Sequence, residues 1–398
     1  MILALEIIFF VSALALIHSY VLYPILITFL SRKKKDNNIV FQSHDDWPFV
    51  TVLMAAYNEE KVMRSKIESL LNLDYPRDKL NIFIGSDNST DSTNNIVNAF
   101  VSQDRRINFI PFYERNGKPQ LINKLEIKSQ ELNPRSAEHI YLMTDASVIL
   151  EEGTLNQLVK HYKNQEIQLV DAHMIYTDIN VEGIAESESK YLSSEVKIKN
   201  AESRLWGKMI GPFGGCYTIR SNKFEAVPQN YLVDDFYIAM NALKNGGKAI
   251  NEMSAKCFEK VSYKISEEYR RKRRISSGNF QNLKSFFFLL NPFSKLGFSF
   301  ISHKVLRWLG PFFMILMICS SFTLMLKDVS WVFTAAFIFL MAWFFLIPLV
   351  NFILKSIKFP IAMLNNIHYF NYMNLALLHG FFDFIKGVRS SIWTPTER

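Results

Sequence analysis

The sequence predicts an α/β domain with a mostly parallel sheet, placed between apolar segments at the two ends of the chain. Between Asp36 and about Leu296, short apolar runs alternate with helix-length periodic segments, as in strands joined by crossover helices. Acidic clusters begin or end three of the apolar runs, at residues 86–91, 144–147 and 233–235. Ligands of open α/β sheets bind beyond the carboxyl ends of the strands, so we expect a catalytic site there.

The first 31 residues predict a membrane anchor. Met1–Leu30 contain one acid and no Lys or Arg, over a length sufficient for a membrane span. A secretory signal peptide is the alternative, but the segment lacks a basic start and a small-residue cleavage site. Arg32–Lys35 follow directly, and such basic flanks stay in the cytoplasm. We therefore predict a transmembrane helix over 1–31 and a cytoplasmic domain from residue 36.

Further apolar segments lie near the C-terminus. Val305–Leu326 and Trp331–Leu354 are separated only by Lys327–Ser330 and predict a helical hairpin through the bilayer. Residues 359–385 are also apolar but include Asn and His side chains, which cost free energy in hydrocarbon unless they face protein or water. A third span is slightly favoured there, and an interfacial helix is the alternative. The predicted divisions are interfacial amphipathic helices over 283–304, a transmembrane region over 305–385 and a tail over 386–398.

Charge and cysteine usage exclude several classes of protein. The formal net charge of +8 does not indicate nucleic-acid binding, because the basic residues cluster beside the apolar segments, where anionic lipid headgroups are the expected counter-charge. Cys216, Cys257 and Cys319 have unrelated spacings and no accompanying His pattern, so neither a disulfide framework nor a zinc site is predicted. The chain has no Gly-rich phosphate loop, which argues against a dehydrogenase or a P-loop ATPase.

The first half of the domain carries the clearest element signals. Phe49–Ala56 is an apolar run that predicts the first strand, and Asn58–Glu60 then supplies a side-chain cap and early acids for a helix. Leu80–Gly85 follows the turn at Asp74–Pro76 and predicts the second strand. Ser89–Asp91 begins the next helix. The same alternation predicts strands over 107–112, 139–143 and 168–176, and helices over 118–129, from 151 to about 164 and from 184 to about 205.

An ordered set of motifs runs through this domain. It comprises Ala-Ala-Tyr-Asn-Glu-Glu (55–60), Ser-Asp-Asn-Ser-Thr-Asp (86–91), Asn-Gly-Lys (116–118) with Asn123, Asp-Ala-Ser (145–147), Gly214-Gly215, Asp234-Asp235 and Arg-Lys-Arg-Arg-Ile (271–275) with Gly278. In this order the motifs resemble those of the membrane-bound family 2 glycosyltransferases, which include cellulose, chitin and hyaluronan synthases and many bacterial surface-polysaccharide enzymes. The resemblance covers about residues 48–285. It implies a GT-A-like nucleotide-sugar-binding domain over 36–282, flanked by N- and C-terminal transmembrane helices in a bacterial inner membrane.

The resemblance assigns a set of residues to the nucleotide part of the donor. A carboxylate accepts hydrogen bonds from a uracil N–H or ribose hydroxyls, an aromatic ring covers a base, and a cation at a turn approaches a diphosphate. Helix capping is the alternative for Glu59 and Asp91, and a solvated surface position is the alternative for Lys118. The predicted nucleotide-binding residues are Ala55, Tyr57, Glu59, Asp87, Lys118, Asp145 and Arg271, with Asn123 as a further contact.

Asp145 and Ser147 occupy the place of the family's Asp-X-Asp, whose acids hold a divalent cation against the diphosphate. Ser147 departs from this pattern. A hydroxyl or a bridging water still completes a magnesium site, because Mg²⁺ often takes only one or two carboxylates plus phosphate oxygens. The resemblance therefore implies Mg²⁺ or Mn²⁺ at Asp145 and Ser147, and a simple turn after a strand is the alternative for Asp145.

The resemblance also implies the catalytic and acceptor residues. Asp235 matches the base that takes the acceptor proton, with Asp234 positioning it, and Arg274 matches the cation that stabilises the departing diphosphate. Gly214 and Gly215 match the loop that faces the acceptor. Ile275 replaces the family's Trp, which supports the acceptor sugar in processive enzymes. A lipid-binding patch is the alternative for the basic run 270–274.

These expectations combine into an inverting glycosyltransferase of the hexosyltransferase type. It would move a sugar from a nucleotide-sugar donor, most simply UDP-linked, to a glycan or lipid-linked acceptor at the cytoplasmic membrane face, in surface-polysaccharide synthesis. Extrusion of a polymer through so few spans would need an export partner or a homo-oligomer. The alternative, prompted by Ser147 and Ile275, is a non-catalytic nucleotide-sugar-binding scaffold of an export assembly. A transporter is excluded because the few spans leave little to form a pathway.

Overall fold

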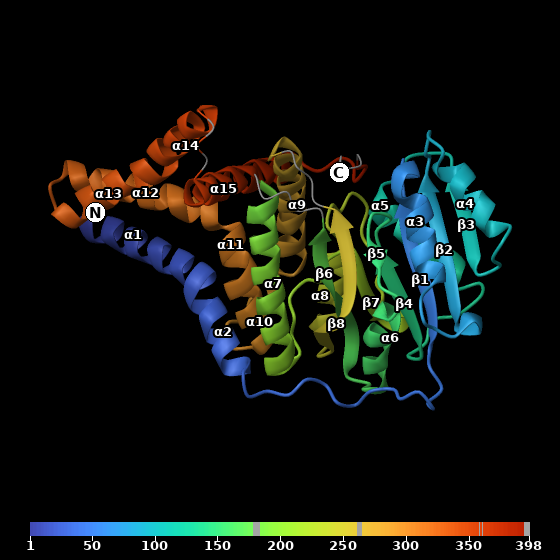
Figure 1. The fold of residues 1–398 in the computed structure, drawn as a ribbon. Coiled ribbons are helices and arrows are strands. Elements are labelled where there is room, and N and C mark those ends of the chain that lie inside the picture. Colours follow the sequence, from blue (N-terminus) through green and yellow to red (C-terminus); the bar gives the residue numbers. More distant parts are fainter. Residues whose placement is uncertain (178–183, 261–264, 358, 360, 394–398) are drawn as a thin grey trace.

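The sheet of the computed structural model follows the predicted α/β pattern. The structure describes residues 1–393 apart from 178–183, 261–264, 358 and 360. In this part of the chain one sheet of eight strands has the order β3-β2-β1-β4-β7-β6-β8-β5 (Figure 1). β1 to β4 pair in parallel, β7 is antiparallel to β4 and β6, β6 and β8 are parallel, and β5 is antiparallel to β8. The strands are β1 (Phe49–Ala56), β2 (Leu80–Asp87), β3 (Ile107–Phe112), β4 (His139–Thr144), β5 (Ile149–Leu150), β6 (Ile167–Thr177), β7 (Cys216–Arg220) and β8 (Lys248–Lys260).

Helices cover both faces of the sheet because successive strand residues point to opposite sides. Val52 packs in a core with Met63 and Ile67 of α3, whereas its neighbour Leu53 packs in a second core with Leu121 of α5. The sequence predicted β1 to β4, β6 and the helices between them, but it did not predict β5, β7 or β8. The helices of the domain are α3 (Glu60–Leu71), α4 (Thr93–Val101), α5 (Lys118–Ser129), α6 (Thr154–Val159), α7 (Ile184–Trp206), α8 (Asp234–Lys244) and α9 (Ile265–Ser285).

Apolar helices gather at the end of the molecule that lies away from β1 to β3 (Figure 1). In the described residues, Ile2–Ser31 and Trp331–Ser356 are each long and apolar enough to cross a membrane. The first comprises α1 (Ile2–Ile17), a π-helical segment and α2 (Tyr23–Ser31), and the second comprises α13 (Trp331–Met341), a π-helical segment and α14 (Ile347–Ser356). The predicted span at 305–326 is different. α12 (Gly310–Leu326) qualifies only together with Lys295–Trp308, from which it bends by 61°.

The segment between α9 and α12 exposes aromatic side chains, and its predicted place in the membrane interface stays a prediction. Phe287, Phe288 and Phe293 are among its most exposed residues, while Phe286 and Phe300 are buried against the domain. Short helices connect them, including α10 (Lys295–Ser299) and α11 (Leu306–Trp308). The chain therefore leaves the domain through a region that packs against the domain on one side and exposes aromatic side chains on the other.

α15 (Ala362–Lys386) packs along α9 of the domain (Figure 1). The carbonyl of Leu377 accepts a hydrogen bond from Ser276 Oγ at 2.8 Å, and Asp383 pairs with Arg273 at 2.5 Å. α15 is not among the candidate spans of the described residues, and the slight preference for a third span over 359–385 stays a prediction. Polar residues of α15 face protein; for example, Asn371 donates to the carbonyl of Trp343 at 2.8 Å.

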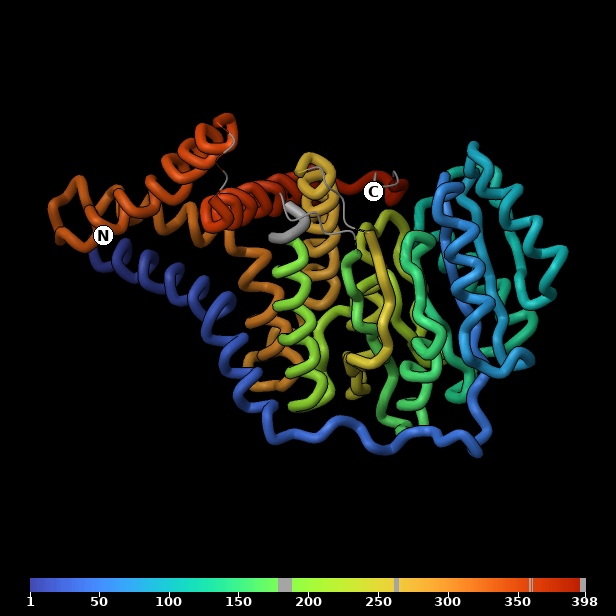
Figure 2. The backbone as a smooth tube through the Cα atoms, in the orientation of Figure 1, coloured from blue at the N-terminus to red at the C-terminus, as the bar shows by residue number. Residues whose placement is uncertain are grey.

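Two connecting segments run past opposite ends of the strands (Figure 2). Residues 32–48 pass from α2 to β1, and on the way Phe41 N–H donates to the carbonyl of Lys160 at 2.8 Å. After α15 the chain returns to the other edge, where the parallel strands end, and it is described as far as Trp393. Residues 394–398 of the predicted tail lie outside the described residues. This return brings Ser391 and Trp393 to the carboxyl ends of the strands, where the catalytic site is predicted.

Candidate active site

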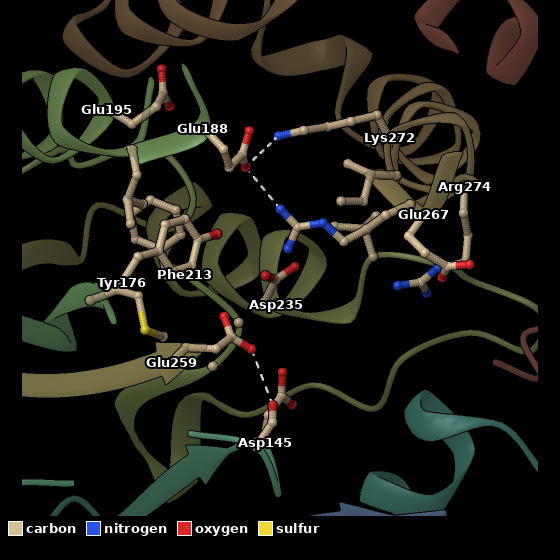
Figure 3. Close-up of a pocket in the computed structure, with 18 of the residues that line it drawn as sticks. Asp145, Tyr176, Glu188, Glu195, Phe213, Asp235, Glu259, Glu267, Lys272 and Arg274 are labelled. Carbon is tan, nitrogen blue, oxygen red and sulfur yellow. Dashed lines mark hydrogen bonds and ion pairs between the residues drawn. The ribbon is translucent and has the colours of Figure 1, made fainter. Parts of the chain in front are cut away.

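One large cavity of about 1750 Å³ opens at the carboxyl ends of β1 and β4. Its walls come from the loops after β1 and β4, the loop before β7, the first turn of α8 and the helix α9. Figure 3 shows Asp145, Asp235, Glu259 and Arg274 directed into this cavity. The cavity continues to the apolar helices, where Tyr20, Arg307 and Asn374 line it. The site therefore joins the edge of the sheet to the membrane side of the molecule.

Asp235 is an acid of the cavity whose pKa is raised. It lies in the first turn of α8, where its Oδ1 accepts a hydrogen bond from Phe236 N–H at 2.7 Å. Burial and the neighbouring carboxylate of Asp234 raise the pKa of Asp235 to about 7. A carboxyl group with this pKa is matched to proton transfer at neutral pH, as a general base requires.

A glycine of the loop before β7 leaves room for the side chain of Asp235. A Cβ at Gly214 would lie 2.5 Å from Asp235 Oδ2, so the glycine permits the carboxylate to approach the backbone. The loop is held by Asp171 of β6, whose Oδ1 accepts the N–H of Phe213 at 3.0 Å and whose Oδ2 pairs with Lys199 at 2.5 Å. Asp171 and Lys199 are positioning residues that the motifs did not indicate.

Lys118 links two of the acidic clusters. Its Nζ lies 2.6 Å from Asp145 Oδ1 and 4.0 Å from Asp234 Oδ2. Although burial opposes the charge, the carboxylates of Asp145 and Asp234 raise the pKa of Lys118. The ammonium group is therefore fixed at the centre of the acidic groups and is not a solvated surface lysine.

The loop that carries Asp145 and Ser147 is supported from behind by a buried lysine. Lys66 of α3 is fully buried, and its Nζ donates to Thr144 Oγ1 at 2.7 Å and to the carbonyl of Val148 at 2.5 Å. Burial lowers the pKa of Lys66 to about 8. On the cavity side, Ser147 Oγ donates to Glu259 Oε1 of β8 at 3.1 Å. Neither Lys66 nor Glu259 belongs to a predicted motif.

The basic run forms part of helix α9. Arg274 Nη1 donates to the carbonyl of Leu232 at 3.2 Å, next to the acids of α8, and Gly278 packs against Val233. Arg271 and Lys272 turn instead toward Glu188 of α7, at 2.9 and 3.0 Å. Only part of the run therefore faces the acidic centre, and Arg271 lines the cavity as the partner of a carboxylate.

Two predicted nucleotide contacts have protein partners in this structure. Asp87 is fully buried, and its carboxylate accepts the N–H groups of Asn116 at 2.6 Å and Gly117 at 3.1 Å. The ring of Tyr57 is covered by Arg115, whose Cζ lies 3.2 Å from the ring centroid. Neither Asp87 nor Tyr57 lines the cavity. Asp87 thus holds the loop that leads to Lys118, and the covered face of Tyr57 is closed to a base unless Arg115 moves.

The residues after α15 reach the site, where Ile392 and Trp393 line the cavity, and the sequence analysis did not predict this. Trp393 packs edge-on against Tyr57, and its carbonyl accepts a hydrogen bond from Arg115 Nη2 at 2.7 Å. Ser391 lies so close to Gly117 that a Cβ there would be 2.5 Å from Ser391 Oγ. No sequence pattern marks these residues, because their partners are more than 250 positions away.

Most of the predicted site residues share the cavity. Asn123 is an exception, since its side chain forms two hydrogen bonds with the backbone of Val227 and does not line the cavity. The predicted residues that line the cavity are Ala55, Glu59, Lys118, Asp145, Ser147, Gly214, Gly215, Asp234, Asp235, Arg271, Arg274 and Ile275.

Comparisons with known proteins show a family and a fold. The model of the glycosyl transferase family group 2 matches residues 139–352, and that of the glycosyltransferase-like family 2 matches residues 48–181. A mannosyltransferase from Pyrobaculum calidifontis, solved with GDP-Man and Mn²⁺, is similar in fold, with a TM-score of 0.66 at 18% identity over 96% of this chain and 99% of that one.

Curated relatives match over shorter stretches. The probable glycosyltransferase YdaM of Bacillus subtilis is 49% identical over 53 residues, or 13% of each chain. The beta-monoglucosyldiacylglycerol synthase of Nostoc is 23% identical over 170 residues, or 42% of this chain and 34% of the relative. The poly-beta-1,6-N-acetyl-D-glucosamine synthase of Staphylococcus epidermidis is 23% identical over 137 residues, or 34% of this chain and 31% of the relative. The matches thus span about a third or less of these relatives.

The first family model covers more than half of the chain. The protein has the GT-A-like fold predicted from its sequence. The chain belongs to the family 2 glycosyltransferases.

Proposed function

We propose that the protein is an inverting glycosyltransferase that moves a sugar from a UDP-linked donor to a hydroxyl of a glycan or lipid-linked acceptor, at the cytoplasmic face of a bacterial inner membrane. The observation that carries this proposal is the position of Asp235. Its carboxylate has a pKa raised to about 7 and shares one cavity with Lys118, Asp145 and Arg274. A base at neutral pH opposite a group of cations is what a displacement from a sugar diphosphate requires.

The reaction would be a single displacement at the anomeric carbon. Asp235 takes the proton of the acceptor hydroxyl as its oxygen attacks the anomeric carbon, and the bond from that carbon to the diphosphate oxygen breaks. The nucleotide diphosphate leaves with the bonding electron pair from the opposite face, so the configuration inverts. Lys118 and Arg274 stabilise the negative charge that develops on the leaving group. Asp234 helps to keep the pKa of Asp235 high.

A divalent cation, Mg²⁺ or Mn²⁺, fits the loop after β4. Asp145 presents a carboxylate with 35% of its side chain exposed, and its Oδ1 already faces a cationic group, the Lys118 ammonium at 2.6 Å. Ser147 adds an oxygen from the same loop. The P. calidifontis mannosyltransferase was solved with Mn²⁺. When bound, such an ion would neutralise charge on the diphosphate of the donor.

The shape of the cavity supports an acceptor that comes from the membrane side. Tyr20, Phe370 and Met373 line the end of the cavity nearest the apolar helices, so an acceptor with a lipid portion would find apolar side chains there. The printed names of the relatives concern a glycolipid and a polysaccharide, and both belong to the proposed acceptor classes. The predicted export partner or homo-oligomer remains a proposal that applies only to a polymeric product.

A donor screen tests the proposal. Purified full-length protein, in detergent or lipid nanodiscs, would be incubated with Mn²⁺, a membrane lipid extract and a panel of nucleotide sugars, and nucleotide release and product mass would be measured. We expect release from UDP-sugars together with a product heavier by one or more sugar residues. Nucleotide binding without release or product from any donor would contradict catalysis and favour the non-catalytic scaffold.

A further inference from the structure

The carboxylate that the Asp-Ala-Ser motif lacks is supplied from another strand. We propose that Glu259 of β8 provides the second carboxylate of the divalent-cation site. The protein ligands would then be the carboxylates of Asp145 and Glu259 and the hydroxyl of Ser147. This inference rests on the proposed function, because it assigns a residue to the metal that the transfer would use. Ser147 Oγ and Glu259 Oε1 are 3.1 Å apart, and both residues line the cavity.

Strand pairing fixes the position of Glu259. The loop from Asp145 runs directly into β5, in which Ile149 pairs with Phe258 and Leu150 with Cys257. The side chains of Phe258 and Glu259 point to opposite faces of the strand, as successive strand residues do. The register between β5 and β8, continued by one residue, places position 259 opposite Val148 and therefore next to Ser147.

The environment of Glu259 suits a cation-binding acid. Glu259 is 9% exposed, and a carboxylate with so little water is stable only with cationic or hydrogen-bonding partners. Arg271 is one source of positive charge, since Glu259 is among the acids that raise the pKa of Arg271 against the effect of burial. On its cavity side, Glu259 meets the hydroxyl of Ser147, which is a ligand type that Mg²⁺ and Mn²⁺ accept.

The small number of protein ligands leads to a further prediction about metal affinity. In the described residues, no three His, Cys, Asp or Glu side chains gather closely enough to hold a metal by themselves. Two carboxylates and a hydroxyl leave the remaining positions to phosphate oxygens and water, as is usual for Mg²⁺ bound with a nucleotide. Metal binding should therefore be weak without nucleotide and should strengthen when UDP is present.

The test is a Mn²⁺ titration of full-length protein, followed by the electron paramagnetic resonance signal of free Mn²⁺, with and without UDP. We expect Glu259→Gln to weaken UDP-dependent Mn²⁺ binding by about tenfold to hundredfold, which is the usual loss when a metal site loses a supporting group. UDP binding in EDTA should be unchanged, which also shows that the variant is folded. Glu225→Gln, at a surface ion pair with Lys244, is the matched control and should bind Mn²⁺ like the wild type.

A compensating variant separates metal binding from other roles of Glu259, such as neutralising Arg271. Ser147→Asp restores a carboxylate within the motif, so the double variant Ser147→Asp/Glu259→Gln should regain Mn²⁺ affinity. Recovery supports the assignment, and failure to recover contradicts it. Wild-type affinity in Glu259→Gln would also overturn it. If Asp145→Asn loses Mn²⁺ binding while Glu259→Gln does not, only this inference fails; if neither variant changes it, the metal proposed for the transfer fails as well.

Discussion

Gly214 lies in direct contact with the carboxylate of Asp235. A Cβ at position 214 would be 2.5 Å from Asp235 Oδ2, closer than two such atoms can approach. The glycine loop and the acid of α8 come from segments that are separate in sequence, yet each determines the space available to the other. The contact explains why a residue without a side chain is needed beside the proposed base.

Gly214→Ala should therefore move Asp235 out of line while leaving the fold intact. We expect the turnover number to fall by about tenfold to hundredfold, because a displacement of about 1 Å at a reacting group has an effect of this size. The KM for the donor should change little. Gly153→Ala is the matched control, since a Cβ at Gly153 would meet nothing within 4 Å. Equal turnover numbers for the two variants would show that the contact is unimportant.

The pH dependence of transfer should report the raised pKa of Asp235. The base acts only when deprotonated, so kcat/KM should fall about tenfold per pH unit below pH 7 and level off above it. Donor turnover measured from pH 5 to 9 would locate the midpoint. A midpoint near 4, the usual range of an aspartate, would mean that Asp235 is not the titrating base.

The raised pKa of Asp235 should also make the stability of the folded protein fall as pH rises, whereas transfer should become faster. Since the pKa of Asp235 is higher in the folded protein than in the unfolded chain, the folded state binds more protons between 3.8 and about 7, and stability falls as pH rises through this window. Asp235→Asn should remove this loss, so its thermal unfolding midpoint at pH 8 should equal or exceed that of the wild type. A lower midpoint for the variant at pH 8 would contradict the burial of a costly charge.

Lys66 should act as a support for the loop of Asp145. Lys66→Met keeps the length of the side chain but leaves Thr144 Oγ1 and the carbonyl of Val148 without their donor. We expect weaker UDP-dependent Mn²⁺ binding, whereas Lys128→Met, at an exposed ion pair, should have no effect. Unchanged Mn²⁺ binding in Lys66→Met would show that the loop holds its shape without this support.

Lys66 also predicts a pH effect. Burial lowers its pKa to about 8, so wild-type stability should rise between pH 8 and 10.5 as the unfolded chain releases the extra proton, and Lys66→Met should lack this rise. Thermal unfolding midpoints of the two proteins at pH 7.5 and 9.5 measure the difference. Parallel behaviour of both proteins would contradict a neutralised lysine in the folded state.

Trp393 should contribute to donor binding through Arg115 and Tyr57. The Arg115 guanidinium lies near both aromatic rings, 3.2 Å from the Tyr57 ring centroid and 5.5 Å from that of Trp393. Removing one cation–π partner in Trp393→Ala should raise the donor KM about fivefold, the equivalent of about 1 kcal/mol. Tyr113→Ala, whose side chain is exposed, serves as the control. A donor KM equal in both variants would assign Trp393 no part in binding.

Sequence reasoning succeeded where local patterns decide the structure. The apolar runs at 49–56 and 139–143 became buried parallel strands, and the acids that follow the strands reached one cavity. It failed where pairing between distant segments decides. Glu259 lies in a strand of mixed Lys and Glu residues, and only the register of β5 with β8 brings it to Ser147. Trp393 likewise reaches Tyr57 only because α15 packs along α9 and directs the chain back.

Asp87 and Tyr57 were predicted to contact the nucleotide, but both have protein partners in the structure. The sequence could not show these partners for a similar reason. The motif around Asp87 indicates an acid at the end of a strand, and the structure places it there. The sequence does not show that the loop after β3 folds over this acid and uses both of its oxygens. Nor does it show that Arg115 covers Tyr57. Roles of Asp87 and Tyr57 at the nucleotide therefore remain predictions.

The most direct test of the proposed mechanism is the variant Asp235→Asn, measured for transfer from the preferred donor and for UDP binding. The loss of the base should reduce transfer by about a hundredfold to ten-thousandfold, the usual contribution of general base catalysis, while the affinity for UDP stays within about twofold. Asp46→Asn, at an exposed ion pair with Lys79, controls for the substitution itself and should transfer like the wild type. Transfer by Asp235→Asn at the wild-type rate would contradict the assignment of Asp235 as the catalytic base.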